Sequence, residues 1–388
     1  WDAFKHYLGL HSTGIQMMIL VPVVAFGVLH NRRHIISNSF KNPLVIWFFW
    51  ILYSLINTYI INDISILPKN AFVLASAIII SFLFVLFISS RHLKTYDLLN
   101  LLIIAYFGRL MLSLMFDSGG FIGSMTRFGE EFNANTIAFG ALFIVVIIAI
   151  KKIQFARISY LDVVFLTIAI LTVVATGSRK NLILLIFLSV SYMYINRSKD
   201  IIKNIIKLSL FGILIAITTI WILNNTYVGE RTLGLYERTV QARDLGAPEK
   251  MFDHRARYYI DGWRLFKNYP VNGVGLTNFA HYDRFSRSLH SEYMAQITEG
   301  GIIGTFIFIM FYLFILLKLY SIRNKDINNK KTAEIYIASV LIMLFLFTGA
   351  WIYRYPVMWV LIALSVRFIY VIEHNRKSNH INQSYSAS

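Results

Sequence analysis

Residues 302–320 read IIGTFIFIMFYLFILLKLY, and this stretch decides the fold class. A bilayer core about 30 Å thick is crossed by a helix of about 20 apolar residues, which is close to the length of this run. Similar runs occur near residues 10–29, 43–62, 70–90, 97–117, 134–150, 158–176, 181–196, 204–223, 334–351 and 355–373. The sequence therefore predicts an all-α polytopic membrane protein with about 11 transmembrane helices.

The composition agrees with a membrane protein. Of the 388 residues, 57% are apolar and 15% are charged, with a mean hydropathy of +0.59. A soluble domain is about one-quarter charged, so an ordinary cytosolic enzyme, a disordered protein and a DNA-binding domain are excluded. The net charge of +17 does not require a nucleic-acid partner, because basic residues gather in the cytoplasmic loops of membrane proteins. The chain has no cysteine, which excludes disulfides and zinc–thiolate sites.

The basic residues also give the orientation. One alternating set of loops carries eighteen Lys and Arg residues, and the opposite set carries six. Loops rich in Lys and Arg stay in the cytoplasm, so residues 1–9 and 224–290 face outward. The sequence begins at Trp1, and one further helix before it would give twelve spans with both ends inside.

This orientation divides the chain into four parts. Residues 1–223 hold transmembrane helices one to eight, and residues 224–290 form one large outer loop with short helices. Residues 291–373 hold a re-entry segment and helices nine to eleven, and residues 374–388 form a cytoplasmic tail.

A helix is predicted inside the outer loop, whose aromatic residues, Tyr259 and Trp263 among them, are expected to supply core material. Apolar and aromatic residues recur at steps of three and four, which marks one helix face: Phe252, Ala256, Tyr259, Trp263 and Phe266. Asp253 lies near its start, and Asn268-Tyr269-Pro270 would end it. Arg257, Asp261 and Arg264 share another face, which is either a solvated surface with an intrahelical ion pair or part of a binding site.

Three arginines outside this loop are candidates for binding. Arg109 lies inside the fourth predicted span, where an unpaired charge costs at least about 2.5–3.5 kcal/mol; it faces a polar cavity or forms a structural ion pair. Arg127 precedes the fifth span and is either a binding or a hydrated residue. In the outer turn 176–181, Ser178 is predicted to cap a helix whose first turn carries Arg179. Free backbone donors beside a guanidinium suit an anion such as phosphate, and the alternative is an interfacial anchor.

His290 is the candidate general base. It is predicted to open a short helix at the membrane surface, and Gly300-Gly301 lets the chain turn into the ninth span. A positive helix start and nearby arginines disfavour a protonated imidazole, and a neutral His is what a general base needs near pH 7. The alternative is a structural histidine. The sequence lacks an Asp-x-Asp motif and a Gly-x-x-x-x-Gly-Lys motif, and we predict neither a metal nor a cofactor.

Residues 255–304 resemble the O-antigen polymerase and O-antigen ligase superfamily. The resemblance rests on Arg-x-Arg-x5-Trp at 255–263, on Tyr-Pro-Val-Asn-Gly from residue 269, and on His290-Ser291, which nine residues separate from the Gly-x-x-Gly of Gly301 and Gly304. The stretch from Arg127 and the Thr-Gly-Ser-Arg turn are also similar, so the likeness covers about 127–310. One departure is Ala134, where members commonly have Pro before the Asn.

The resemblance implies metal-independent, inverting transfer from an undecaprenyl-pyrophosphate-linked oligosaccharide at the periplasmic face of the bacterial inner membrane. Membrane lipid and a chain-length regulator are the other implied partners. A pyrophosphate leaving group needs fixed positive charge, which Arg179 would supply together with Arg255, Arg257 or Arg264. His290 would take the proton of the acceptor hydroxyl. The remaining candidates for substrate binding are Arg109, Arg127, Tyr258, Trp263 and Ser291.

Three functions remain open at this point. A polymerase joins lipid-linked repeat units. The His-Ser-Glu-Tyr form and the many aromatic and Asn residues of this sequence resemble those of chain-extending members of the superfamily, so we favour the polymerase. A ligase would move the glycan to lipid A core. A flippase or exporter of lipid-linked glycans needs charges along a path between two halves, whereas this chain collects Arg, His and Trp in one outer loop.

Overall fold

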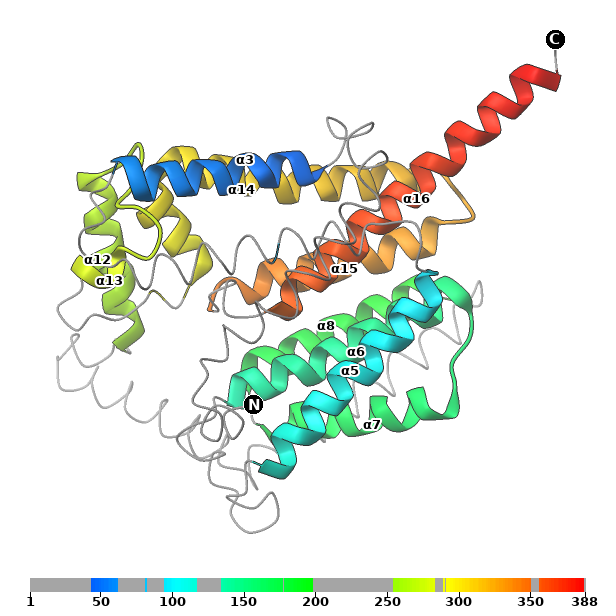
Figure 1. Ribbon diagram of the computed structural model, residues 1–388. Coiled ribbons are helices and arrows are strands. Elements are labelled where there is room, and N and C mark those ends of the chain that lie inside the picture. Colours follow the sequence, from blue (N-terminus) through cyan, green and yellow to red (C-terminus); the bar gives the residue numbers. More distant parts are fainter. Residues whose placement is uncertain are drawn as a thin grey trace, which may run out of the picture. The chain divides into compact units, whose positions relative to one another are not determined.

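The computed structural model describes residues 43–61, 81, 94–116, 134–176, 178–197, 254–282, 289, 291–349 and 356–386. Every regular element within these ranges is a helix (Figure 1), which agrees with the predicted all-α class. The elements are α3 (Pro43–Ile56), the π-helical turn η2 (Asn57–Ile61), α5 (Thr95–Phe116), α6 (Ala134–Phe155), α7 (Tyr160–Ala175), α8 (Arg179–Ile195), α12 (His254–Asn268), α13 (Phe279–Tyr282), α14 (Glu292–Lys325), α15 (Lys330–Leu346) and α16 (Pro356–Ser386).

Three segments among the described residues are long and apolar enough to cross a membrane: Pro43–Ile60, Ile137–Phe155 and the helix Glu292–Lys325. Tyr160–Val174 and Lys180–Ile195 are shorter apolar helices. These segments support a polytopic membrane protein, and the total of eleven spans stays a prediction. The predicted spans at 10–29 and 204–223 lie outside the described residues, as does nearly all of 70–90.

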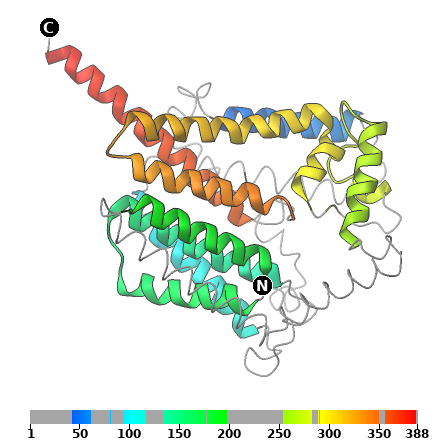
Figure 2. The same cartoon turned by 180° about the vertical axis from the view of Figure 1, so that it is seen from behind.

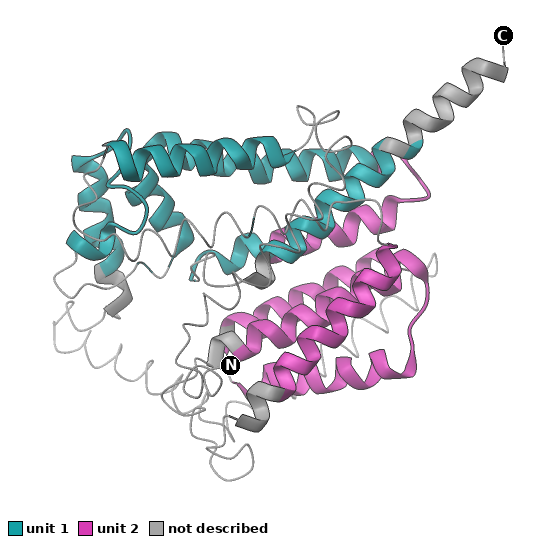
Figure 3. Ribbon diagram, viewed as in Figure 1, with its two compact units in different colours: residues 1–93, 254–322, 343–388 teal, residues 94–253, 323–342 magenta. Residues whose placement is uncertain are grey.

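The chain forms two compact units, shown in different colours in Figure 3. Unit 1 comprises residues 1–93, 254–322 and 343–388, and unit 2 comprises residues 94–253 and 323–342. In unit 2, α6 is the buried helix and packs against α5, α7 and α8. A buried ion pair joins α6 to α7, with Lys151 Nζ 2.6 Å from Asp162 Oδ2. The predicted four-part division of the chain stays a prediction.

In unit 1, α3 lies along α14, and α12 and α13 lie across one end of this pair (Figures 1 and 2). Aromatic rings hold the helices together. Trp47 of α3 lies 4.9 Å from Phe311 of α14 and 4.4 Å from Trp359 of α16, measured between ring centroids. Trp50 stacks on Trp47 at 4.5 Å. These buried indoles bring large apolar areas into one contact, which explains why α3 follows α14.

The long helix α14 is broken at Gly301, whose φ of 61° and ψ of −162° are open to glycine almost alone. The prediction that the chain turns at Gly300-Gly301 is confirmed. A break leaves the first N–H groups of the next helical segment without partners inside the helix. Here Ile302 and Ile303 donate to the carbonyls of Pro270 and Val271, at 2.9 and 3.3 Å.

The carbonyls before the break are also paired. The N–H groups of Val274 and Gly275 donate to Thr298 and Glu299, at 3.0 and 2.9 Å. Tyr53 of α3 donates its hydroxyl to the Gly300 carbonyl at 2.8 Å. The turn after α12 and the end of α3 therefore bind both sides of the break.

Both glycines of the Gly-x-x-Gly pattern have a packing reason. A Cβ at Gly301 would lie 2.6 Å from the Gly273 nitrogen and closer still to the Val271 carbonyl oxygen. A Cβ at Gly304 would lie 2.8 Å from the Tyr53 ring. The pattern is thus required by the close approach of the loop and α3 to α14.

We expect Gly301→Ala to lower the free energy of unfolding by about 1–3 kcal/mol or more, because the backbone conformation is strained for alanine and the new methyl group meets backbone atoms. The matched control is Gly300→Ala, whose Cβ would have no neighbour nearer than 3.7 Å. The control should be neutral or stabilising by about 0.5–1 kcal/mol. Unfolding of the purified protein in detergent measures both, and equal effects of the two substitutions would contradict this account of the break.

Candidate functional site

The segment of α14 before the break packs against α12 and α13. Tyr258, Phe279, Leu289, Met294 and Ala295 form one buried apolar cluster. This contact is close because α12 has no side chain at Gly262: a Cβ there would lie 3.0 Å from Thr298 Oγ1. Thr298 also donates its hydroxyl to the Gly262 carbonyl at 3.2 Å. The cluster therefore fixes α12 on the start of α14.

The predicted bounds of α12 are close to the observed ones, since the helix ends at Asn268 as expected. The predicted buried face is wrong. Tyr259 and Trp263 are 44% and 48% exposed, whereas Tyr258 is 7% exposed. The face that packs is centred on Gly262, because the missing side chain permits the closest approach of two helices. Trp263 instead lies against Phe266, with 5.1 Å between ring centroids.

The last turn of α15 and the residues just after it form the second support of this region. Three donors from α12 and the start of α14 bind carbonyl oxygens there. They are the Tyr259 hydroxyl to Thr348 at 3.0 Å, the Glu292 N–H to Phe347 at 2.8 Å and the Tyr293 hydroxyl to Leu344 at 2.7 Å. The C-terminal carbonyls of a helix lack partners within it, so these bonds fasten the end of α15 to the start of α14.

Ser291 lies directly before α14. Its Oγ accepts from the N–H of Met294 at 3.5 Å, in the position of a helix cap. The same hydroxyl donates to the Phe347 carbonyl at 3.4 Å. Ser291, a predicted substrate-binding residue, is thus buried, and it also caps the start of α14.

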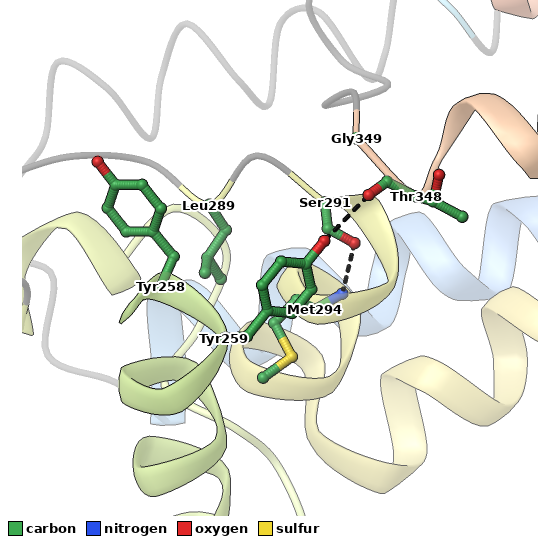
Figure 4. Close-up of a pocket in the computed structure, with 7 residues that line it drawn as sticks. All are labelled: Tyr258, Tyr259, Leu289, Ser291, Met294, Thr348 and Gly349. Atoms are coloured by element: carbon green, nitrogen blue, oxygen red, sulfur yellow. Dashed lines mark hydrogen bonds between the residues drawn. The ribbon is translucent and has the colours of Figure 1, made fainter. Parts of the chain in front are cut away.

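A partly enclosed cavity of about 70 Å³ opens between these elements (Figure 4). Its lining comes from α12, the start of α14 and the end of α15: Tyr258, Tyr259, Leu289, Ser291, Met294, Thr348 and Gly349. His290 lies outside the described residues. Its two chain neighbours, Leu289 and Ser291, both line this cavity, which makes the cavity the candidate functional site.

A chain of buried polar groups lies on the other side of the same helical segment. Gln296 donates its amide to Glu292 Oε1 at 2.7 Å and accepts from Trp50 Nε1 at 3.0 Å. Glu292 and Gln296 are at most 2% exposed. These bonds join α14 to α3. The sequence analysis missed this pair, and the available signal was two polar residues one helical turn apart before an apolar run.

The predicted arginines are placed as follows. Arg264 is exposed and lies 3.6 Å from Asp261 in an i,i+3 ion pair, which matches the solvated alternative. Arg255 and Arg257 lie in the first turn of α12, and Arg179 begins α8; nothing is described of their side chains. Arg109 is exposed on α5 in unit 2, and Arg127 lies outside the described residues.

The prediction that Ser178 caps a helix with Arg179 in its first turn is confirmed in position, since Ser178 is the N-cap residue and α8 begins at Arg179. The Ser178 side chain, however, makes no capping hydrogen bond to the helix backbone. Its hydroxyl oxygen instead accepts from Nδ2 of the buried Asn181, at 2.7 Å. The Asn181 amide thus binds the Ser178 oxygen that would otherwise accept from a backbone N–H of the helix.

Tyr282 of α13 has a raised pKa. Its partial burial is the larger cause, and the neighbouring Tyr269 adds to it. Its phenol therefore stays neutral and able to donate a hydrogen bond at physiological pH. Across the described ranges, no group of three or more His, Cys, Asp or Glu residues is arranged to hold a metal ion.

The fold and the cavity define a polytopic, all-helical membrane protein with a small site at one end of a broken membrane helix. Residues 163–309 match the family model Wzy_C, described as O-antigen ligase. This match confirms the resemblance to the O-antigen polymerase and ligase superfamily, and it contains α12, α13 and the break in α14. No curated protein matches the chain. The matched stretch is less than half of the chain.

We expect Tyr259→Phe to lower the free energy of unfolding by about 0.5–1.5 kcal/mol, the usual net value of one hydrogen bond, because the bond to Thr348 is lost. The control is Tyr160→Phe on α7, where the ring is 82% exposed, and it should leave stability unchanged. Chemical unfolding in detergent compares the two variants. A Tyr259→Phe protein as stable as the control would show that this bond does not hold α12 to the end of α15.

Proposed function

We propose that the protein is a surface-polysaccharide polymerase of the O-antigen type. It transfers an undecaprenyl-pyrophosphate-linked glycan onto the terminal sugar hydroxyl of a second lipid-linked repeat unit, at the periplasmic face of the bacterial inner membrane. One observation carries the proposal: the family match at 163–309 includes Leu289 and Ser291, the two cavity-lining residues that flank position 290 in the sequence. Membrane lipid and a chain-length regulator are the proposed partners.

The proposed reaction is a single displacement. The acceptor oxygen forms a bond to the anomeric carbon, and the bond from that carbon to the pyrophosphate oxygen breaks with inversion. The acceptor proton passes to His290, and the pyrophosphate leaves with the bonding electrons. Negative charge grows on the leaving group, so fixed cations placed there stabilise the transition state.

The start of α14 supports His290 as the base. Residue 290 precedes Ser291 directly, and Ser291 stands at the positive end of that helix. A helix N-terminus disfavours a protonated imidazole over the first turn, so the neutral form that a base requires is favoured. Chain connectivity keeps this residue within one peptide, about 3.8 Å between Cα atoms, of two residues that line the cavity.

Arg179 with Arg255, Arg257 or Arg264 is the proposed clamp for the pyrophosphate. Arg255 and Arg257 belong to the first turn of α12, the helix that also carries Tyr259 into the cavity. Arg264 is available because its exposed ion pair with Asp261 contributes little. Arg109 and Arg127 are proposed as secondary contacts.

Aromatic stacking on sugars is proposed for Trp263 and Tyr259. Both rings are nearly half exposed, whereas Tyr258 is buried in the apolar cluster. The exposed rings offer the flat apolar face that a sugar ring can cover. The Tyr259 oxygen, which donates its proton to Thr348, can still accept a hydrogen bond. Tyr258 thus contributes to substrate binding by forming the cavity wall.

A second candidate function is ligation of the glycan to lipid A core, which the description of the matched family favours. Both reactions use the same donor end. A flippase for lipid-linked glycans is the alternative from another class. The three are separated by incubating the purified protein with a lipid-linked repeat unit alone, and then with lipid A core added.

A ladder of longer lipid-linked products supports the polymerase. Transfer that occurs only after lipid A core is added would replace it with the ligase. Absence of any transfer, with glycan movement across vesicle membranes instead, would contradict both enzymes.

We expect His290→Ala to abolish product formation, a loss of at least about 100-fold if a general base is removed, while the protein still folds and inserts. His281→Ala is the control, because His281 is an exposed histidine of α13 in the same unit, and it should retain activity. Product analysis by gel after incubation with the lipid-linked substrate measures both. Normal chain length in His290→Ala would refute the catalytic role.

A further inference from the structure

The cavity beside position 290 is small. A buried water needs about 10–15 Å³ on the same measure, so about 70 Å³ holds a group of a few heavy atoms but not a whole sugar ring. A substituent of the sugar fits this space better than the sugar itself. The sugar ring would lie outside, where Tyr259 is partly exposed.

The lining is mostly apolar, with a polar edge on one side. Leu289 and Met294 are 3% and 8% exposed and belong to the buried apolar cluster. On the other side lie the Tyr259 hydroxyl and the Thr348 carbonyl that it binds. Each of these two oxygens keeps acceptor capacity after forming that bond. A ligand for this cavity should therefore carry a methyl group and an N–H donor.

We infer that the cavity receives the acetamido group of an N-acetylated acceptor sugar. The methyl group packs against Met294 and Leu289, and the amide N–H donates to the Tyr259 or Thr348 oxygen. A hydroxyl group in the same place would leave the apolar wall uncovered, and a plain methyl group would leave the oxygen edge without a donor. The inference rests on the proposed function, since it takes the sugar to react at position 290.

Met294 is one of the residues that line the cavity. Its side chain packs closely on α12 at Gly262, where an added Cβ would lie 3.1 Å from Met294 Cε and 3.2 Å from Met294 Cγ. Shortening this side chain should therefore enlarge the cavity by the volume removed. A longer acyl group would then fit, which is a gain of function that a folding defect does not produce.

The experiment uses the full chain in lipid nanodiscs with a lipid-linked glycan donor and three acceptor saccharides. The acceptors differ only in one substituent beside the attacking hydroxyl, which is a hydroxyl, an acetamido or a butanamido group. The unmodified protein should prefer acetamido over hydroxyl by about 10-fold or more, and should reject butanamido by a similar factor. Met294→Ala should raise the use of butanamido relative to acetamido by at least about 10-fold.

The matched control is Leu319→Ala, which truncates a fully buried side chain of the same helix far beyond the break. It should keep the order of preference of the unmodified protein. Equal use of all three acceptors by the unmodified protein, or an unchanged order in Met294→Ala, would overturn the inference.

Failure of the inference is distinguishable from failure of the proposed function. If no acceptor is glycosylated, the proposed function fails, and saturation-transfer NMR with a methyl glycoside of an N-acetylhexosamine tests the cavity alone. The acetyl methyl group should receive the strongest saturation in the unmodified protein and in Leu319→Ala. The acetyl methyl group should lose this strong saturation in Met294→Phe, because the phenylalanine ring fills the cavity. Equal saturation across the sugar in the unmodified protein would overturn the inference.

Discussion

Lipid offers no partner to a backbone N–H or carbonyl group, so a break in a membrane helix must have its polar groups bound by protein. At Gly301 the turn after α12 meets this need on both sides, with Pro270 and Val271 as acceptors and Val274 and Gly275 as donors. The turn after α12 cannot leave α14 without exposing these groups. The break thus positions α12, and α12 carries one wall of the cavity.

The other wall depends on the end of α15. The carbonyls of Leu344, Phe347 and Thr348 receive donors from α12 and from the start of α14. Three segments far apart in the sequence, α12, the start of α14 and the end of α15, therefore meet at the cavity. The buried pair Glu292 and Gln296 joins the same helical segment to α3 through Trp50. Bonds to α3, to the turn after α12 and to the end of α15 hold the short helix before the break in place, which suits the proposed alignment of two substrates.

Local signals allowed part of this arrangement to be predicted. The end of α12 and the break at Gly301 depend on Pro and Gly residues whose backbone preferences act locally. The buried face of α12 was predicted wrongly, because the pattern counted large apolar side chains, whereas the contact depends on their absence at Gly262. The hydrogen bond from Trp50 to Gln296 joins residues 246 positions apart, so it cannot be predicted from the residue pattern of a single helix. The partners of the clamp arginines depend on the fold in the same way.

The central claim is that position 290 opens to the outer face and into the site of the lipid-linked glycan. The chain has no cysteine, so His290→Cys places a single thiol there. Its labelling by a membrane-impermeant maleimide in intact spheroplasts tests the claim, with Lys325→Cys at the predicted cytoplasmic end of α14 as the control. The account predicts rapid labelling at position 290, slowed by added lipid-linked glycan, and no labelling at position 325. Labelling at position 290 only after the membrane is permeabilised, or at a rate that the glycan does not change, would contradict it.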